Sequence, residues 1–390
     1  MTMELEEVKT KRQAVEFVQM PLRLYEHEKN WIRPLDSDIE AVFDPALNKN
    51  FEHGECTRWI LRKNGTVIGR VAAFINRKDL HKENEQPTGG MGFFECINDQ
   101  QAANLLMDAA LDWLKARGME AMDGPVNFGD RDKWWGLLIQ GFELEPNYLC
   151  NYNFPYYKQL FESYGFKEYF QQFTFRRNIL DPLHPRIMAK AEKVAADPDY
   201  RFEHMRLKQY KKYVKDIVTI YNKAWTNHEG VGAISESQVT AIIKKVKSVI
   251  DEKIIWFGYY KEEPVAFYIN LPEVNQIFKH VNGKLDLVGK LRFLWHTWRK
   301  TNRKMQGLVF GVVPEHQRKG LDGAIIAAFS EMVQKKYRRY DTLEINGIGD
   351  FNPKMIVVMK QVGGEICKIH ATYRYLFDRN QRFERMKAIK

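Results

Sequence analysis

The sequence of 390 residues is poor in cysteine, has no long apolar run and carries only a modest excess of one charge. Its four cysteines, Cys56, Cys96, Cys150 and Cys367, are far apart and form no CxxC or Cys/His cluster. Such usage is typical of reduced thiols in the cytoplasm and predicts neither a disulfide framework nor a metal site. No uncharged apolar run reaches about 20 residues, so no membrane-spanning helix is expected. The charged first residues are unlike a secretory signal.

The charge balance is 60 Lys and Arg against 50 Asp and Glu, a net charge of +10. A basic excess of this size fits a phosphate-bearing ligand, a membrane surface or a nucleic acid. No helix-turn-helix, zinc-finger or RNA-binding signature accompanies it, so we expect no nucleic acid partner. A content of 44% apolar and 28% charged residues is typical of a globular protein, and the length suggests two domains.

Two similar successions of strands and helices follow one another along the chain. The first has a hairpin around Asn64-Gly65, a strand and a long helix, expected at residues 58–76, 92–97 and 101–117. The second has the same order, expected at residues 254–270, 308–313 and 323–336. Each succession closes with a short helix, a glycine and a strand. The repetition indicates a duplication, with domains at 1–178 and 199–390 and a linker at 179–198 that contains a short helix.

The most informative stretch is residues 308–328, LVFGVVPEHQRKGLDGAIIAA. An apolar strand is followed by a basic loop, Gln317-Arg318-Lys319-Gly320, which opens into a helix. The first turn of a helix has N–H groups without intrahelical partners and the positive end of the helix dipole, so it can hold an anion. Gly320 allows close approach of the backbone, while Arg318 and Lys319 add positive charge for phosphate oxygens.

This stretch resembles the acyl-CoA-binding motif of the GNAT superfamily, the Gcn5-related N-acetyltransferases, in which Gln/Arg-x-x-Gly-x-Gly/Ala joins a strand to a helix. Gln317 and Gly320 match the pattern, whereas Asp322 stands where a small residue is usual and is followed by Gly323 and Ala324. The resemblance covers essentially the whole chain as two copies. It implies an α/β (α+β) fold of two tandem GNAT-like domains, each a mixed, mostly antiparallel central sheet flanked by helices.

The resemblance also implies that acetyl-CoA or another acyl-CoA binds in the second half. The residues expected to hold it are Val312, Val313, Gln317, Arg318, Lys319, Gly320, Gly323, Ala324 and Asn352. The corresponding loop of the first half, residues 98–101, has no glycine and no basic residue and carries Asp99. We therefore expect the first half to hold no cofactor. Two plain strand–helix turns remain the alternative.

The mechanism implied by the resemblance is direct acyl transfer to a neutral amine. Backbone N–H groups of Val312 and Val313 are expected to polarise the thioester carbonyl, and a general base is needed for the amine. Glu344, on the strand after the motif helix, is the first candidate for the base, and Glu315 and His316 are weaker ones. An ordinary exposed strand-end carboxylate is the alternative reading of Glu344.

The leaving thiolate in this superfamily often takes a proton from a tyrosine of the later helix. Met359 stands at that place here, so Tyr373 or water is expected to supply the proton. The acceptor is expected near loops of the first half that gather polar and aromatic residues. Its candidate contacts are Asn127, Trp134 and Tyr156, for which packing inside a structural loop is the alternative.

A basic helix rich in tryptophan is expected at residues 290–304, KLRFLWHTWRKTNRK. Its apolar residues, including Trp295 and Trp298, follow helical spacing on one face. Such a helix fits contact with an anionic lipid surface or closure over an acyl chain, and a solvated basic face is the alternative. Contact of this kind would place the protein at the inner face of the membrane.

Three functions are compatible with these patterns. The first is an N-acyltransferase that moves an acyl group, most simply acetyl, from acyl-CoA to a primary amine bound near the junction of the domains. The second is an acyltransferase for a lipid-like or hydrophobic amine at a membrane surface. The third is a non-catalytic CoA-binding or ligand-binding protein on a decayed GNAT scaffold, which Asp322 and Met359 favour.

Overall fold

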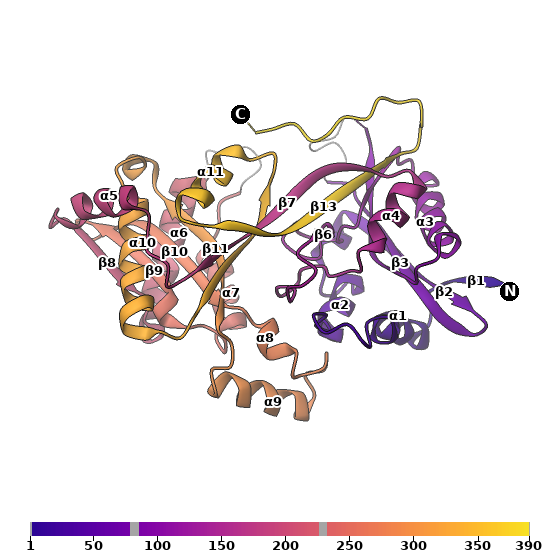
Figure 1. Ribbon diagram of the computed structural model, residues 1–390, viewed down its shortest axis with the longest axis horizontal. Helices are drawn as coiled ribbons and strands as arrows, with labels where there is room; N and C mark the ends of the chain where they lie inside the picture. The colour runs from indigo at the N-terminus through magenta and orange to yellow at the C-terminus, as the bar shows by residue number, and fades with distance from the viewer. Residues whose placement is uncertain (1, 79–85, 226–231, 390) are drawn as a thin grey trace.

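The computed structural model describes residues 2–78, 86–225 and 232–389, which form two halves of similar composition (Figure 1). The strands of the first half are β1 (Met3–Glu7), β2 (Gly54–Lys63), β3 (Thr66–Asn76), β4 (Thr88–Cys96), β5 (Ala121–Gly124), β6 (Leu137–Gln140) and β7 (Lys167–Asn178). Its helices are α1 (Lys11–Leu24), α2 (Asp36–Phe43), α3 (Gln100–Lys115) and α4 (Tyr156–Tyr164).

The second half follows a similar order, with an additional pair of helices, α8 and α9, before its fourth strand, β11. Its strands are β8 (Tyr200–His204), β9 (Ile255–Tyr260), β10 (Glu263–Pro272), β11 (Lys304–Val312), β12 (Thr342–Gly349) and β13 (Glu365–Leu376). Its helices are α5 (Pro185–Ala195), α6 (Tyr210–Trp225), α7 (Glu236–Val246), α8 (Asn275–Phe278), α9 (Leu287–Trp298), α10 (Leu321–Glu331) and α11 (Pro353–Gln361).

One sheet runs through both halves in the order β1-β2-β3-β4-β5-β13-β7-β12-β11-β10-β9-β8, with β6 paired to β13. Among the described strands, β4 pairs with β5 and β11 with β12 in parallel, and the other pairs are antiparallel. The expected mixed, mostly antiparallel sheet flanked by helices is therefore confirmed. The hairpin of β2 and β3 turns at Asn64 and Gly65, which both have positive φ, as the Asn-Gly signal predicts.

The last strand of each half pairs with the other half. β13 lies between β5 and β7, with Tyr373 opposite Gly124, and β7 lies between β13 and β12, with Phe175 opposite Ile345. Figure 1 shows these two long strands crossing the middle of the molecule. The proposed domain boundaries at 178 and 199 therefore lie beside a seam where β7 and β13 are shared.

Separate cores stabilise the two halves. In the first half, α3 covers one face of the hairpin through Leu106 and Met107, while α1 and α2 cover the other through Phe17 and Ile39. In the second half, α5, α6, α7 and α10 contribute to one cluster over β9 and β10. No described helix has the length and apolarity that would let it cross a membrane.

The basic helix of the second half is shorter than expected, which corrects its predicted span of 290–304. α9 ends at Trp298, and the chain turns at Lys300, which has a φ of 52°. Lys304 begins β11 and is buried beside Glu344, at 3.5 Å. Lys304 therefore lies in β11, paired with Glu344, and is not part of the helix.

Candidate functional site

The fourth strand of the second half, β11, parts from its parallel neighbour, β12. β11 pairs with β12 from Lys304–Thr342 as far as Gly307–Ile345, and then β12 continues alone beside β7. In the described part of the chain, residues 308–312 of β11 consequently have one edge without a strand partner. Residues 310–312 line a groove there of about 300 Å³ together with Ala224, His316, Gln317, Arg318 and Asp322. We call this the β11 groove.

One end of the β11 groove lies at the start of α10. Gly320 immediately precedes the helix with a φ of 88°, and no side chain of the described residues caps the helix. The equivalent helix of the first half, α3, is capped by Asp99, whose carboxylate accepts hydrogen bonds from Gln101 N at 2.9 Å and Ala102 N at 3.2 Å. The anion position is thus occupied by the chain's own carboxylate in the first half and left without one in the second.

Charges of both signs face the β11 groove. Arg318 lines it in a left-handed conformation, with a φ of 62°, and Lys319 is exposed beside it. Asp322 also lines the groove and is exposed. The basic pair and the uncapped helix favour a phosphate-bearing ligand, whereas Asp322 weakens that preference. The residues present therefore fit a CoA arm, with one unfavourable charge.

The two amides expected to polarise a thioester differ in their surroundings. Val313 N donates to Val265 O at 2.9 Å, so it is already engaged by β10. N–H groups alternate in direction along a strand, so Val312 N points to the opposite edge, which β12 has left. Gln317 Nε2 donates to Val312 O at 3.0 Å and fixes the loop against the strand. Val312 is therefore the better placed of the two.

The other predicted cofactor residues pack or cap helices. A Cβ on Gly320 would lie 3.0 Å from Lys190 Cβ, and one on Gly323 would lie 3.2 Å from Ile187 O, so both glycines let α5 pack against α10. Ala324 is buried in the same core. Asn352 Oδ1 accepts from Met355 N at 3.2 Å and caps α11.

Glu344 lies in a buried cluster of charges rather than at an exposed strand end. Its side chain is 0% exposed and accepts hydrogen bonds from Lys368 Nζ at 2.8 Å, Asn147 Nδ2 at 2.7 Å and Arg176 Nε at 2.8 Å. Burial alone would raise the pKa of Glu344, but the charges of Lys368 and Lys304 outweigh it and lower the pKa to about 2. A carboxylate so strongly held is a weak base, which argues for a structural role.

The other catalytic candidates lie in different places. Glu315 is exposed in the short turn before the loop. His316 lines the β11 groove, and its Nδ1 lies 2.7 Å from Tyr200 Oη. Burial and the charge of Lys319 lower the pKa of His316, so this ring is available in its neutral form. Tyr373 is fully buried in the core of the first half, where its hydroxyl donates to Glu162.

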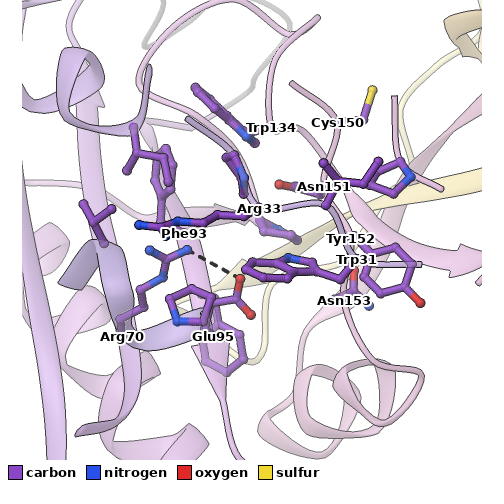
Figure 2. Close-up of a pocket in the computed structure, with 18 of the residues that line it drawn as sticks. Trp31, Arg33, Arg70, Phe93, Glu95, Trp134, Cys150, Asn151, Tyr152 and Asn153 are labelled. Carbon is purple, nitrogen blue, oxygen red and sulfur yellow. Dashed lines mark hydrogen bonds and ion pairs between the residues drawn. The ribbon is translucent and has the colours of Figure 1, made fainter. Parts of the chain in front are cut away.

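A second pocket lies where β4 parts from β5 in the first half, at the place equivalent to the β11 groove. The parallel pairing ends at Gly90–Asp123. Beyond it lies a cavity of about 60 Å³, which we call the Glu95 pocket. Its walls include Trp31, Arg33, Arg70, Phe93, Glu95, Trp134, Cys150 and Tyr157. Figure 2 shows aromatic side chains enclosing the Arg70–Glu95 ion pair.

Glu95 makes this pocket polar in an apolar surrounding. Its Oε2 accepts hydrogen bonds from Tyr25 and Tyr157, each at 2.7 Å, while the one partner of Oε1 among the described residues is Arg70 at 3.5 Å. Burial raises the pKa of Glu95 above its usual range, against the charge of Arg70. Because 3.5 Å is long for an ion pair of this kind, Oε1 retains capacity to accept a bond from a ligand.

Of the three predicted acceptor contacts, one lines the Glu95 pocket and two do not. Trp134 lines the Glu95 pocket. Asn127 is buried, and its Oδ1 has no hydrogen-bond partner among the described residues. Tyr156 donates its hydroxyl to Cys96 O at 2.7 Å and does not line the pocket. Glu95 and Arg70 were not singled out from the sequence, although each is a charged residue inside an apolar strand, a pattern that could have revealed them.

The Glu95 pocket and the β11 strand meet at the seam between the halves. Cys150, in the pocket wall, accepts from Asn346 Nδ2 at 3.4 Å, and Asn147 Nδ2 donates to Asn346 Oδ1 at 2.7 Å. Asn346 follows Ile345, the last residue of β12 that pairs with β11. The pocket wall therefore touches the point at which β11 and β12 separate.

Comparison with solved structures identifies the fold. A tandem GNAT protein from the clavulanic acid biosynthesis pathway superimposes with a TM-score of 0.53, at 10% identity, over 97% of this chain and 100% of that chain. The chain thus has the tandem GNAT fold, as the resemblance implied. No protein-family model matches the chain.

Two curated proteins are similar in sequence along nearly their whole length. One, from Caulobacter vibrioides (strain NA1000 / CB15N), is named bacterial ceramide synthase and is 26% identical over 371 residues, covering 94% of this chain and 95% of that protein. The other, Protein YghO from Escherichia coli (strain K12), is 25% identical over 361 residues, covering 92% and 91%.

Proposed function

We propose that this protein is an acyl-CoA-dependent N-acyltransferase that acts on the primary amine of a lipid-like acceptor. The observation that carries the proposal is the β11 groove, where a strand edge without a partner leads into an uncapped helix behind Gly320. The likeness to a protein named bacterial ceramide synthase supports a lipid-like amine over a small soluble one. Acetyl-CoA and longer acyl-CoA molecules are the donors to compare.

The chain's own residues have distinct parts in this proposal. The first turn of α10 and Arg318 hold the phosphates, and the acyl-CoA supplies a thioester carbonyl beside β11. Val312 N–H donates a hydrogen bond toward that edge. His316, whose pKa is lowered by burial and by the charge of Lys319, is the candidate in the groove that can take the amine proton. The amide C–N bond forms as the thioester C–S bond breaks, and CoA leaves as its thiolate, which takes a proton from water.

In this proposal the Glu95 pocket holds a polar group of the acceptor, and the reacting amine extends past the seam toward β11. Oε1 of Glu95 accepts from that polar group, and the faces of Trp31 and Trp134 favour a cation or an apolar chain. The contact of Cys150 with Asn346 places this pocket against the point where β11 and β12 separate. Acceptor and donor therefore approach the seam from opposite halves.

The cofactor assignment predicts that Gly320→Val lowers CoA affinity at least about tenfold. A Cβ at this position meets Lys190, and a φ of 88° disfavours any side chain. Gly118→Val is the matched control, since Gly118 has a φ of 78° but open space around it. Calorimetric titration with CoA is the measurement, and equal affinities of both variants contradict the assigned groove.

A charge variant tests the same groove even if the glycine variants fail to fold. Asp322→Asn removes the carboxylate from the β11 groove and is expected to tighten CoA binding by a few-fold, about 2–5 times at low salt. Asp322 is exposed, so the fold is not at risk. An unchanged affinity means that no phosphate lies near Asp322.

The acceptor assignment predicts that Glu95→Gln raises the KM for the amine and leaves the affinity for CoA unchanged. The amide keeps the shape of the side chain but loses the charge that attracts the polar group of the acceptor. Tyr156→Phe, which loses a hydrogen bond to Cys96 outside the pocket, is the control. Thiol release with a panel of amines is the assay; a KM equal to that of the control removes the acceptor from the Glu95 pocket.

A non-catalytic CoA-binding protein is the second candidate function. Asp322 in the groove and Met359, buried where a proton-donating tyrosine is usual, favour it. CoA binding without thiol release, for every donor and amine tested, is the result that selects this function.

A further inference from the structure

An exposed apolar helix projects from the second half. α9 stands away from the sheet in Figure 1, connected by α8 on one side and β11 on the other. Asp286 caps its start by accepting from Gly289 N at 2.8 Å. Its inner side is anchored by Phe293, which stacks on Phe278 at 5.6 Å, and by His296, which stacks on His280 at 3.8 Å. The helix is therefore fixed in orientation.

The outer side of α9 is apolar, the reverse of an ordinary surface helix. Leu287 is 75% exposed and Trp298 is 73% exposed. The exposed apolar residues of the helix are Leu287, Val288, Leu291, Leu294, Trp295 and Trp298. At about 100° per residue they share one face about 120° wide. A contiguous apolar surface of this kind marks an interaction site.

Basic residues flank this apolar face. Lys290 projects at one border of it and Arg292 at the other, by the same helical spacing, and both are exposed. Arg299 lies over the Trp295 ring at 5.7 Å, and Lys300 follows. The one acidic residue of the helix region, Asp286, is engaged as the cap. Apolar and aromatic residues between two basic borders match the boundary of an anionic bilayer, where chains lie inward and phosphates outward.

The segment that packs beneath α9 also forms part of the wall of the Glu95 pocket. Asp36 N donates to Gly283 O at 2.9 Å, and Leu35 packs with Phe278 and Val281 beneath the helix. The segment that carries Leu35 also supplies Trp31 and Arg33 to the pocket wall. One short segment thus connects the exposed helix to the place proposed for the acceptor.

We propose that α9 docks the protein on an anionic phospholipid surface, with its apolar face among the acyl chains and its basic borders at the phosphates. Docking brings the segment beside the Glu95 pocket to the bilayer, so that a lipid-like amine reaches the pocket without crossing water. Delivery of the amine to the pocket rests on the proposed function, whereas docking itself does not.

Sedimentation of the full-length chain with vesicles tests the docking. Vesicles of phosphatidylcholine mixed with phosphatidylglycerol should bind the protein more tightly than phosphatidylcholine alone, and added salt should weaken the binding. Trp295→Ser with Trp298→Ser should lower the affinity at least about tenfold. Both tryptophans are exposed, so the fold is retained. Lys290→Glu with Arg292→Glu should abolish the preference for phosphatidylglycerol.

The matched control removes exposed apolar side chains elsewhere. Val15→Ser with Ile242→Ser alters residues that are 52% and 55% exposed on α1 and α7, and it should leave vesicle binding unchanged. Absence of wild-type binding, equal binding to both vesicle types, or equal loss in the control overturns docking. So does an α9-dependent oligomer that forms without vesicles and does not bind them. Thiol release with a water-soluble amine should persist in the tryptophan variant, which separates loss of docking from loss of the proposed activity.

Discussion

The negative charge of Glu344 stabilises the fold and is poorly suited to catalysis as a base. Its low pKa means that the native state favours the ionised form, so this contribution to stability is complete above the ordinary pKa of 4.5 and is lost as the pH falls toward about 2. Glu344→Gln leaves Lys368 and Lys304 buried without a countercharge and should lower the free energy of unfolding at pH 7 by about 3 kcal/mol.

Urea unfolding followed by tryptophan fluorescence from pH 7 to pH 3 measures this effect. The difference between Glu344→Gln and the wild type should shrink toward pH 3, because the carboxylate of the unfolded wild type then takes up a proton while the native carboxylate, with a pKa of about 2, stays ionised. Glu331→Gln is the control, since Glu331 pairs with Lys336 at 3.4 Å on the exposed surface. Equal destabilisation by both variants contradicts the central role of Glu344.

Burial of charged residues was the part of the site that the sequence predicted least well. Glu95 and Glu344 are both on strands, yet their partners Arg70 and Lys368 lie 25 and 24 residues away in sequence. Periodicity reports which neighbours along the chain are apolar, whereas the burial of a carboxylate depends on cations delivered by other strands. The alternative reading of Glu344 as exposed and the failure to notice Glu95 follow from the same limitation.

At the scale of elements, local signals were reliable where the cause was local. The Asn64-Gly65 turn, the short helix before the second half and the short helix before the last strand, α11, all occur as expected, because turn residues and caps act over a few positions. Asp99 and Gly320 begin equivalent helices, and the sequence distinguished them correctly as an acidic and a glycine start. The predicted end of α9 was wrong because Lys304 pairs with the buried Glu344 and belongs to β11.

At the scale of the molecule, the exchange of β7 and β13 predicts that the halves do not fold independently. A fragment of residues 1–178 lacks β13, the strand that separates β5 from β7. We expect this fragment to lack a cooperative unfolding transition and a native near-ultraviolet circular dichroism spectrum, since the edges of β5, β6 and β7 are left unpaired. The full-length chain should unfold with coincident fluorescence and circular dichroism transitions.

The antiparallel pairing of β7 with β13 offers a matched control for the fragment. Arg176 lies opposite Glu365, so residues 365–377 can follow residue 178 through a short flexible linker as a hairpin. This extended fragment should recover cooperative unfolding. Cooperative folding of residues 1–178 without the added strand shows instead that the first half is complete by itself. The sharing of these strands was beyond the sequence pattern, which repeats the order of elements without specifying which half each strand joins.

The position of β13 also governs the order of events during synthesis. The chain leaves the ribosome from its N-terminus, and early domains ordinarily fold while later ones are still being made. Here β5 and β6 wait for a neighbour that ends at Leu376. The first half must therefore remain unfinished, with strand edges in need of protection, until residues 365–376 have been synthesised.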